Sequence, residues 1–139
     1  MTRINVVPVE ILTDKHLLAE YKEITRPFNK AYKRLQDNNL NYNKSDHYLL
    51  NTGHESFFFD KILYLHKRYE QIKVEMLARG FNVNLELYRE ISDKFKTWFE
   101  GSVLWNDYTP RPEDIYLSMA RLVKRAHIES VDIELASNK

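Results

Sequence analysis

Residues 52–80 read TGHESFFFDKILYLHKRYEQIKVEMLARG, and they carry the clearest secondary-structure signal in the chain. Its apolar residues recur every three or four positions, which is the spacing of one buried helix face. Gly80 follows the last of them, and glycine commonly ends a helix. Thr52 and Glu55 have the spacing of a capping box at the start. The pattern predicts one long helix over residues 53–79. The residues expected on its buried face are Phe58, Ile62, Leu65, Tyr69, Ile72 and Met76.

The same periodicity continues on both sides, and only three glycines and four prolines interrupt the chain. A first helix is expected to begin at Thr13 or Asp14, which are good N-caps. Pro27 falls inside it and cannot donate to the carbonyl of Glu23, so a kink is expected next to Glu23. The polar, Asn-rich residues 36–52 predict a long loop.

Two further helices are expected towards the C-terminus. One covers about residues 85–99, and a lesser one begins at Pro112, where acidic residues follow the proline in the first turn. We therefore expect an all-α fold over residues 1–139, as a single compact domain. It should contain three principal helices and a shorter fourth helical segment, with the N-terminal segment packed near the first helix. The inner stripe expected for the last helix is Ile115, Met119, Leu122 and Ala126.

Composition narrows the class of protein. The 139 residues suffice for one buried core, and the absence of cysteine excludes disulfides and thiolate metal sites. No apolar run reaches the length of a membrane span, and charges recur through the first 30 residues, unlike a signal peptide. We expect a soluble cytoplasmic protein, in the host cytoplasm or nucleoid if the source is viral.

The net charge is only +1, but cations gather in residues 1–34 and again around Arg121, Lys124 and Arg125. Such clustering predicts a basic face even on a nearly neutral protein, although ordinary solvated charge is the alternative. Within the first cluster, Glu23 stands between Lys22 and Arg26. This carboxylate could stabilise a developing cation, or it could be a surface acid in salt bridges.

Two histidines are weaker candidates for chemistry. His16 lies two turns before Glu23 and could share proton transfer, although a surface role is the alternative. For His54, packing or hydrogen bonding to the backbone is the favoured interpretation. The sequence has no glycine-rich phosphate loop and no metal-ligand pair of recognisable spacing, so we expect neither a metal nor an organic cofactor.

Several short segments together resemble one family, the pyrimidine-dimer DNA glycosylases with associated abasic-site lyase activity. These are small all-helical repair enzymes of viral and bacterial origin. No single segment is specific, but the set is co-linear over nearly the whole chain. The segments are MTRIN at 1–5, HLLAEYKE at 16–23, TGHESFFFDK at 52–61, RGFN at 79–82, ISD at 91–93, DYTP at 107–110 and the Ala-Arg pair of SMARLVKR at 118–125.

The resemblance implies a mechanism. Met1 is removed, and the α-amine of Thr2 attacks C1′ of the damaged nucleotide, so that the base leaves and an imine forms. Elimination then cuts the strand. An α-amine suits this role because its pKa, about 8, leaves a useful neutral fraction near pH 7. Glu23 matches the essential carboxylate of the family. The cationic positions beside the scissile site are matched by Arg3, Lys22 and Arg26. The phosphate-binding positions are matched by Arg121 and Arg125.

The chain also departs from the family pattern. Lys22 stands where the best-known members carry arginine, so a bidentate phosphate contact becomes a point charge. The aromatic C-terminal tail of the family, implicated in lesion recognition, is not found in a chain that ends VDIELASNK. We hypothesise that Trp105 supplies an aromatic surface near the DNA instead, whereas Trp98 is expected to belong to the core.

Three functions remain open at this point. The leading one is a bifunctional glycosylase and lyase for cyclobutane pyrimidine dimers in double-stranded DNA, acting as a monomer without membrane contact. The second keeps the chemistry but changes the base to another damaged or modified pyrimidine. The third is a helical DNA-binding protein without catalysis, against which the joint presence of Thr2 and Glu23 argues.

Overall fold

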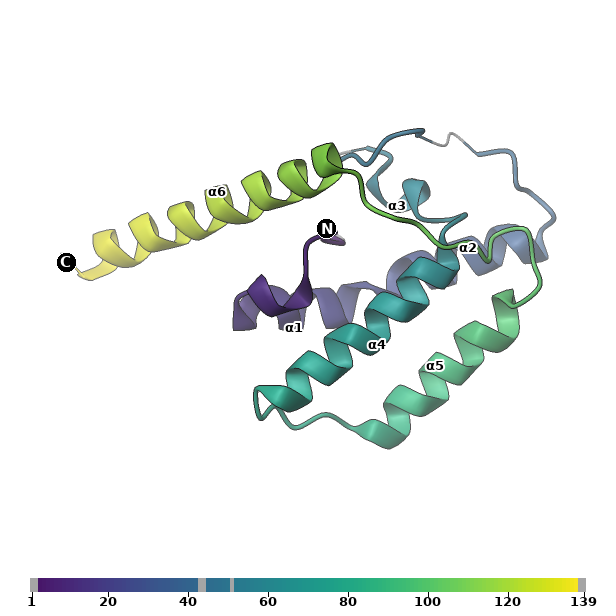
Figure 1. Cartoon of the computed structure of the whole chain (residues 1–139), viewed down its shortest axis with the longest axis horizontal. Coiled ribbons are helices and arrows are strands. Elements are labelled where there is room, and N and C mark those ends of the chain that lie inside the picture. The colour runs from purple at the N-terminus through teal and green to yellow at the C-terminus, as the bar shows by residue number, and fades with distance from the viewer. Residues whose placement is uncertain (1–2, 43–44, 51, 138–139) are drawn as a thin grey trace.

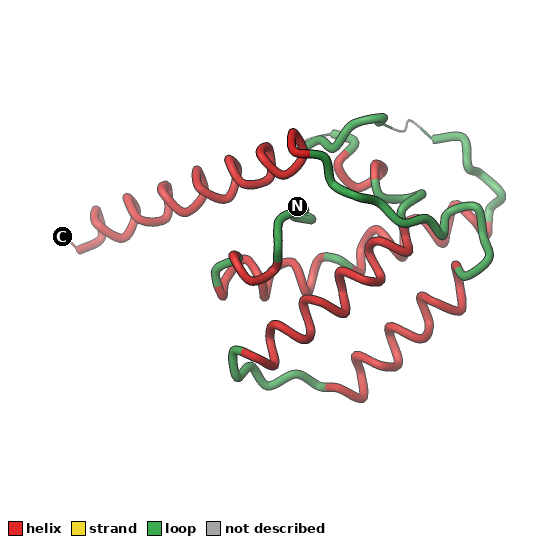
Figure 2. Tube along the Cα trace, viewed as in Figure 1, coloured by secondary structure: helices red, strands yellow, loops and turns green. Residues whose placement is uncertain are grey.

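The computed structural model describes residues 3–42, 45–50 and 52–137, with side chains up to residue 124. This part of the chain contains helices and no strand, so the all-α prediction is confirmed (Figures 1 and 2). None of its helices has the length and apolar character needed to cross a membrane. The elements are η1 (Val9–Ile11), α1 (Asp14–Glu23), α2 (Thr25–Gln36), α3 (His54–Phe57), α4 (Ile62–Ala78), α5 (Leu85–Phe99) and α6 (Pro112–Ser137).

The long helix α4 is the centre of the fold, with α1, η1 and α5 packed against it (Figure 1). Leu65 and Ile72, both on its predicted apolar face, are fully buried. Helix α5 has the predicted bounds, and its N-cap Asn84 accepts a hydrogen bond from the amide of Leu87 at 3.0 Å. Gly80 ends α4 with a φ of +85°, a conformation that glycine adopts without strain.

The first predicted helix is divided at Ile24, next to Glu23 as expected. Thr13 is its N-cap, and the threonine hydroxyl accepts a hydrogen bond from the amide of His16 at 3.2 Å. Helix α2 then begins at Thr25, and Pro27 lies in its first turn, where a missing N–H costs nothing. The division of this helix into α1 and α2 therefore follows from the proline.

The prediction of a single helix over 53–79 is wrong, because α3 ends at Phe57 and α4 begins at Ile62. Phe57, Phe58 and Phe59 are all buried, whereas consecutive residues of one helix point about 100° apart and cannot share a face. The amide of Ile62 donates instead to the carbonyl of Leu104 at 3.1 Å, which caps α4 as a separate helix.

The predicted capping box is wrong as well. Gly53, with a φ of +96°, precedes α3, and no side chain caps this helix. Glu55 forms an ion pair with Lys30 of α2 instead, across the space between the two helices. The predicted loop before α3 is confirmed, since the described residues between Gln36 and His54 contain no helix.

Aromatic stacking joins α2 to α5. The rings of Phe28 and Phe95 stack with centroids 4.1 Å apart, and those of Tyr32 and Trp98 stack at 3.8 Å. Phe28 is fully buried and Trp98 is partly buried. Trp98 therefore belongs to the core, as expected.

Helix α6 is longer than predicted and extends away from the other helices in Figure 1. Its predicted inner stripe is largely wrong, because Ile115 and Met119 are exposed, and the side chain of Ala126 lies outside the described ones. Leu122 is buried as predicted, whereas Asp114 and Ser118 are buried in place of Ile115 and Met119. The polar members of this stripe face inward because they satisfy donors there: Asp114 accepts from Tyr108, and Ser118 accepts from the N-terminal segment.

Candidate active site

The N-terminal segment reaches the end of α1 at Glu23. The backbone amide of Arg3 donates a hydrogen bond to Glu23 Oε2 at 3.0 Å. Glu23 is the last residue of α1, so its carboxylate lies at the junction with α2 and remains partly exposed. A substrate can therefore approach the carboxylate that the backbone of Arg3 contacts.

Side chains from distant parts of the chain hold the rest of this segment. The amide of Ile4 donates to His54 Nε2 at 2.8 Å, and the Tyr48 hydroxyl donates to the carbonyl of Ile4 at 2.8 Å. The amide of Val6 donates to Ser118 Oγ at 3.2 Å. The loop before α3, α3 itself and α6 thus each supply a partner to the same short segment. We call residues 3–7 the anchored segment.

A buried ion pair lies beneath the anchored segment. Glu20 is 1% exposed and Arg68 is 4% exposed. Arg68 donates to both carboxylate oxygens of Glu20, through Nε at 2.5 Å and Nη2 at 3.1 Å, and through Nη1 to the carbonyl of Val7 at 2.6 Å. Asn5 Nδ2 donates to Glu20 Oε1 at 2.8 Å, and Arg121 Nη2 donates to Asn5 Oδ1 at 2.9 Å.

The protonation states of this cluster follow from its surroundings. Burial disfavours the charge on Arg68, but the ion pair and hydrogen bonds with Glu20 outweigh it, so the pKa of Arg68 is raised. Burial lowers the pKa of His54, and the nearby Arg3 and Arg121 lower it further, against a raising effect of the Leu49 carbonyl. His54 is therefore neutral at pH 7, as an acceptor of a backbone amide must be.

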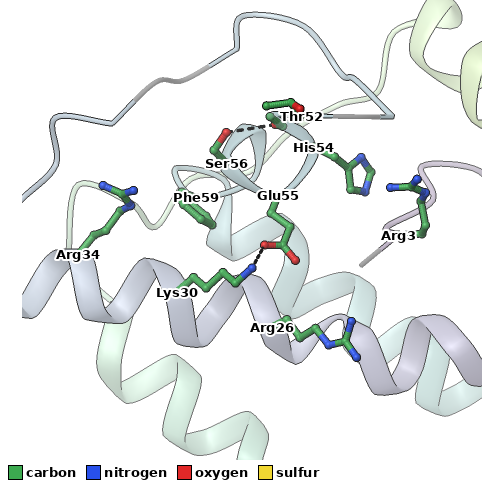
Figure 3. A pocket seen from close by; sticks show the side chains of 10 residues that line it. Arg3, Arg26, Lys30, Arg34, Thr52, His54, Glu55, Ser56 and Phe59 are labelled. Atoms are coloured by element: carbon green, nitrogen blue, oxygen red, sulfur yellow. Dashed lines mark hydrogen bonds and ion pairs between the residues drawn. The ribbon is translucent and has the colours of Figure 1, made fainter. Parts of the chain in front are cut away.

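A basic groove opens beside the anchored segment, with a volume of about 580 Å³ (Figure 3). Arg26, Lys30 and Arg34 are spaced four residues apart, which places them on one face of α2. Arg3 faces them across the groove, and Lys30 is ion-paired with Glu55. The lining residues are Arg3, Arg26, Lys30, Arg34, Thr52, Gly53, His54, Glu55, Ser56 and Phe59. With four cations and one acid, this groove favours an anionic ligand.

The structure brings some of the predicted site residues together. Arg3 contacts Glu23, and Arg26 lines the groove with Arg3. Lys22 is exposed in the last turn of α1, directly before Glu23. His16 is partly buried in the first turn of α1, two turns from Glu23. Glu23, Arg3 and Arg26 therefore form the nucleus of the candidate site.

Other predicted residues lie elsewhere or outside the described part. Arg121 is partly buried under the anchored segment through its contact with Asn5. Thr2 and the side chain of Arg125 lie outside what the structure describes. Trp105, in the loop before α6, lies with its ring 5.6 Å from that of His66 and is not among the groove residues.

The sequence interpretation missed the partners of the anchored segment. Neither Glu20 nor Arg68 is among the site residues that the sequence predicts. The helical spacing does indicate that both residues are buried. Arg68 lies three residues after Leu65 and four before Ile72, which are both buried. Glu20 has the same spacing to the buried Leu17 and Ile24. Both charges thus lie on apolar faces, where each requires a partner. Within the described residues, no group of three or more potential metal ligands occurs.

An acid beside a basic groove, on an all-helical scaffold, is an arrangement suited to a nucleic-acid-binding protein with a candidate catalytic site. Residues 1–89 of the 139 match the family model described as pyrimidine dimer DNA glycosylase. The chain therefore belongs to the pyrimidine dimer DNA glycosylase family, and it is a DNA glycosylase of DNA repair whose substrate is DNA. The match includes the anchored segment, Glu23 and α1 to α4, and it ends within α5, before Trp105 and α6.

Proposed function

We propose that this protein is a bifunctional DNA glycosylase and abasic-site lyase that acts on cyclobutane pyrimidine dimers in double-stranded DNA. Its nucleophile is the α-amine of Thr2, exposed when Met1 is removed. The observation that carries the proposal is the contact of the Arg3 amide with Glu23 Oε2 at 3.0 Å. It joins the chain directly after Thr2 to the acid that the chemistry requires.

Covalent geometry adds to this argument. The amide nitrogen of Arg3 is bonded to the carbonyl carbon of Thr2, so the α-amine of residue 2 lies within about 4 Å of that nitrogen in any conformation. Since Glu23 Oε2 is 3.0 Å from the same nitrogen, an amine at residue 2 is within reach of one nucleotide bound at Glu23. An amine at residue 1 would lie one residue further along the chain.

The proposed chemistry proceeds in two stages. The neutral amine forms a bond to C1′ as the C1′–N bond breaks, and the bonding electrons leave with the base, which takes up a proton. Loss of the amine proton and opening of the sugar ring give a protonated imine. The imine acidifies C2′, and removal of a C2′ proton expels the 3′ phosphate, which cuts the strand. Water then hydrolyses the imine and releases the amine.

Glu23 has a defined place in both stages. As an anion it stabilises the positive charge that develops on the sugar and then on the imine. Its position beside the amine also lets it accept and return protons. Arg3 and Arg26 face the groove and are suited to hold the phosphates on either side of the reacting nucleotide. We expect Lys22, Arg121 and Arg125 to add phosphate contacts, and His16 to assist near Glu23.

Borohydride trapping tests the nucleophile. Mature protein is incubated with DNA that contains an abasic site, and borohydride reduces the imine to a stable adduct, which is mapped by mass spectrometry. We expect the adduct on residue 2. The matched control is Thr2→Gln, whose larger side chain prevents Met removal and displaces the amine by one residue. Thr2→Ser permits removal and should trap normally. An adduct on a lysine, or none with mature protein, would refute the proposal.

A panel of DNA duplexes tests the substrate. We expect base release from ultraviolet-irradiated DNA and from none of the oxidised or hypermodified pyrimidines. Release from another pyrimidine alone would favour the same chemistry on a different base, and binding without any release would favour a non-catalytic protein. The proposed steps need no metal or organic cofactor, so we expect full activity in the presence of a chelator.

A further inference from the structure

His54 makes two hydrogen bonds, and both are to the backbone. Its Nδ1 lies 2.5 Å from the carbonyl oxygen of Leu49, and its Nε2 lies 2.8 Å from the amide nitrogen of Ile4. A carbonyl oxygen only accepts, so Nδ1 carries the proton, and Nε2 offers its lone pair to the Ile4 amide. The geometry assigns one neutral tautomer to His54.

This arrangement leaves His54 without a free nitrogen. It is 3% exposed, although the groove beside Arg3 opens next to it (Figure 3). To exchange a proton with a substrate, the imidazole would have to release the backbone of Ile4. His54 is therefore unsuited to acid or base catalysis, and its effect on the reaction must pass through the backbone that it holds.

The backbone that it holds is the one that leads to Thr2. Glu23 binds the amide of Arg3, and His54 binds the amide of Ile4. Two consecutive amides are thus fixed by side chains from two different elements, α1 and α3. Tyr48, itself 3% exposed, fixes the carbonyl of Ile4 from the loop before α3. These three contacts oppose both sliding of the chain along its axis and rotation about it.

The local sequence keeps His54 in place. Gly53, at a φ of +96°, lets the chain turn into α3, where an L side chain would be strained. The rings of Tyr48 and Phe58 meet the imidazole edge to face, with centroids 5.5 Å and 5.7 Å away. The imidazole therefore cannot swing away from Ile4 without disturbing the packed aromatic residues around it.

We propose that His54 is a positioning residue, which, through the amide of Ile4, holds the α-amine of Thr2 at attacking distance beside Glu23. This rests on the proposed function, since it assumes that the amine is the nucleophile. Misplacement of a reacting group by about 1 Å can cost about 100-fold in rate. Loss of the His54 contact should therefore slow imine formation far more than it weakens DNA binding.

The experiment compares His54→Gln with His54→Leu. The glutamine side chain carries an acceptor oxygen at about the reach of Nε2, whereas leucine fills similar space without an acceptor. Imine formation is measured by single-turnover borohydride trapping on abasic-site DNA at saturating protein, and the dissociation constant is measured separately. We expect His54→Leu to trap 10- to 100-fold more slowly, with a dissociation constant changed less than about 3-fold. His54→Gln should recover most of the rate.

The outcomes separate this proposal from the one on which it rests. If wild-type protein forms no adduct, the N-terminal nucleophile itself is wrong. If wild type forms the adduct and a folded His54→Leu protein traps at the same rate, only the positioning role is overturned. Equal slowing of the glutamine and leucine variants would also overturn it. Should His54→Leu fail to fold, Tyr48→Phe removes the hydroxyl that donates to the carbonyl of Ile4 and must slow trapping severalfold without weakening binding.

Discussion

Glu23 combines two roles that one substitution can separate. Its carboxylate accepts the Arg3 amide and, in the proposed mechanism, stabilises cationic intermediates. Glu23→Gln keeps an acceptor oxygen but removes the charge. We expect strand cleavage at abasic sites to fall by about 100- to 10,000-fold, the usual range for a lost acid–base group, while DNA binding persists. Gel analysis of cleavage under single-turnover conditions measures the loss.

Glu10 offers the matched control, because it is an exposed acid in η1 and is not among the residues of the groove. Glu10→Gln should cleave at the wild-type rate. Cleavage by Glu23→Gln within about 3-fold of wild type would remove the charge of Glu23 from the mechanism.

His54 makes stability depend on pH. Its pKa is lowered in the folded state by burial, so the unfolded chain binds more protons as pH falls below about 6.5. The contribution of neutral His54 to the free energy of unfolding is fully present above about pH 6.5. It is lost as pH falls towards the folded pKa, and the free energy of unfolding then falls by at most about 1.4 kcal/mol per pH unit. Urea denaturation at pH 7.5 and 5.5 should show this loss.

His54→Gln supplies the comparison, because this variant differs from wild type only in lacking the imidazole at residue 54. The variant should lose less free energy of unfolding between the two pH values than wild type does. Equal losses would mean that His54 takes up a proton as readily in the folded state as in the unfolded chain, contrary to its role as an acceptor of the Ile4 amide.

At the scale of elements, the sequence predicted where helices occur and that the first one breaks next to Glu23, but it did not predict the break between Phe57 and Ile62. The apolar spacing of α5 predicted its bounds, and Thr13 predicted the start of α1. Both signals are local, because caps and apolar faces are encoded within a few residues. The break before Ile62 depends on the carbonyl of Leu104, 42 residues later, so no local pattern contains it.

The polar contacts of the site also join residues that are distant in sequence, so local patterns do not predict them. Arg68 and Glu20 lie on apolar faces, and each charge signals that a partner exists, but the sequence does not say which acid meets which cation. The resemblance to a family predicted Thr2, Glu23, Arg3 and Arg26 as site residues, because these positions belong to its motifs. The hydroxyls of Tyr48 and Ser118 form hydrogen bonds with the backbone of the anchored segment, which is distant from both in sequence. Neither periodicity nor motif spacing reveals such contacts.

The cations on the face of α2 that lines the groove lead to a prediction about DNA affinity. Arg34 lies two turns from Arg26, and its guanidinium stands over the rings of Tyr42 and Phe59, 5.1 Å and 5.9 Å from their centroids. If the Arg34 guanidinium contacts one phosphate, Arg34→Gln should make the dependence of the DNA-binding constant on salt less steep. The slope of the logarithm of that constant against the logarithm of the salt concentration should fall in magnitude by about 0.9. The loss should be equal for damaged and undamaged duplexes, because phosphates carry no sequence information.

Lys96→Gln is the control for Arg34→Gln. Lys96 is exposed on α5 and is not among the groove residues, so this variant changes the net charge equally. Its salt slope should match wild type in fluorescence anisotropy titrations. The same reduction in both variants would show that net charge, and not the groove, sets the affinity.

At the scale of the whole molecule, the site exists only when distant parts of the chain have assembled. The amide of Val6 reaches Ser118, 112 residues away, and that of Ile4 reaches His54, 50 residues away. Most chain termini fray, and their amides exchange with solvent almost freely. The anchored segment is an exception, because releasing it requires the loss of contacts to α1, α3, α4 and α6 together.

We therefore expect the amides of Ile4, Asn5 and Val6 to exchange with a free energy close to that of global unfolding, as measured by hydrogen exchange with NMR detection. The fully buried Leu65 in α4 provides the global reference. Ser118→Ala should speed exchange at Val6 and leave Ile4 protected, because Ile4 keeps its own partners on His54 and Tyr48. Exchange of Ile4 in wild type at the rate of an unprotected amide would show that the segment opens independently. An amine carried on such a segment would spend its time away from Glu23, and the rate of imine formation would then be limited by closing of the N-terminus and not by chemistry.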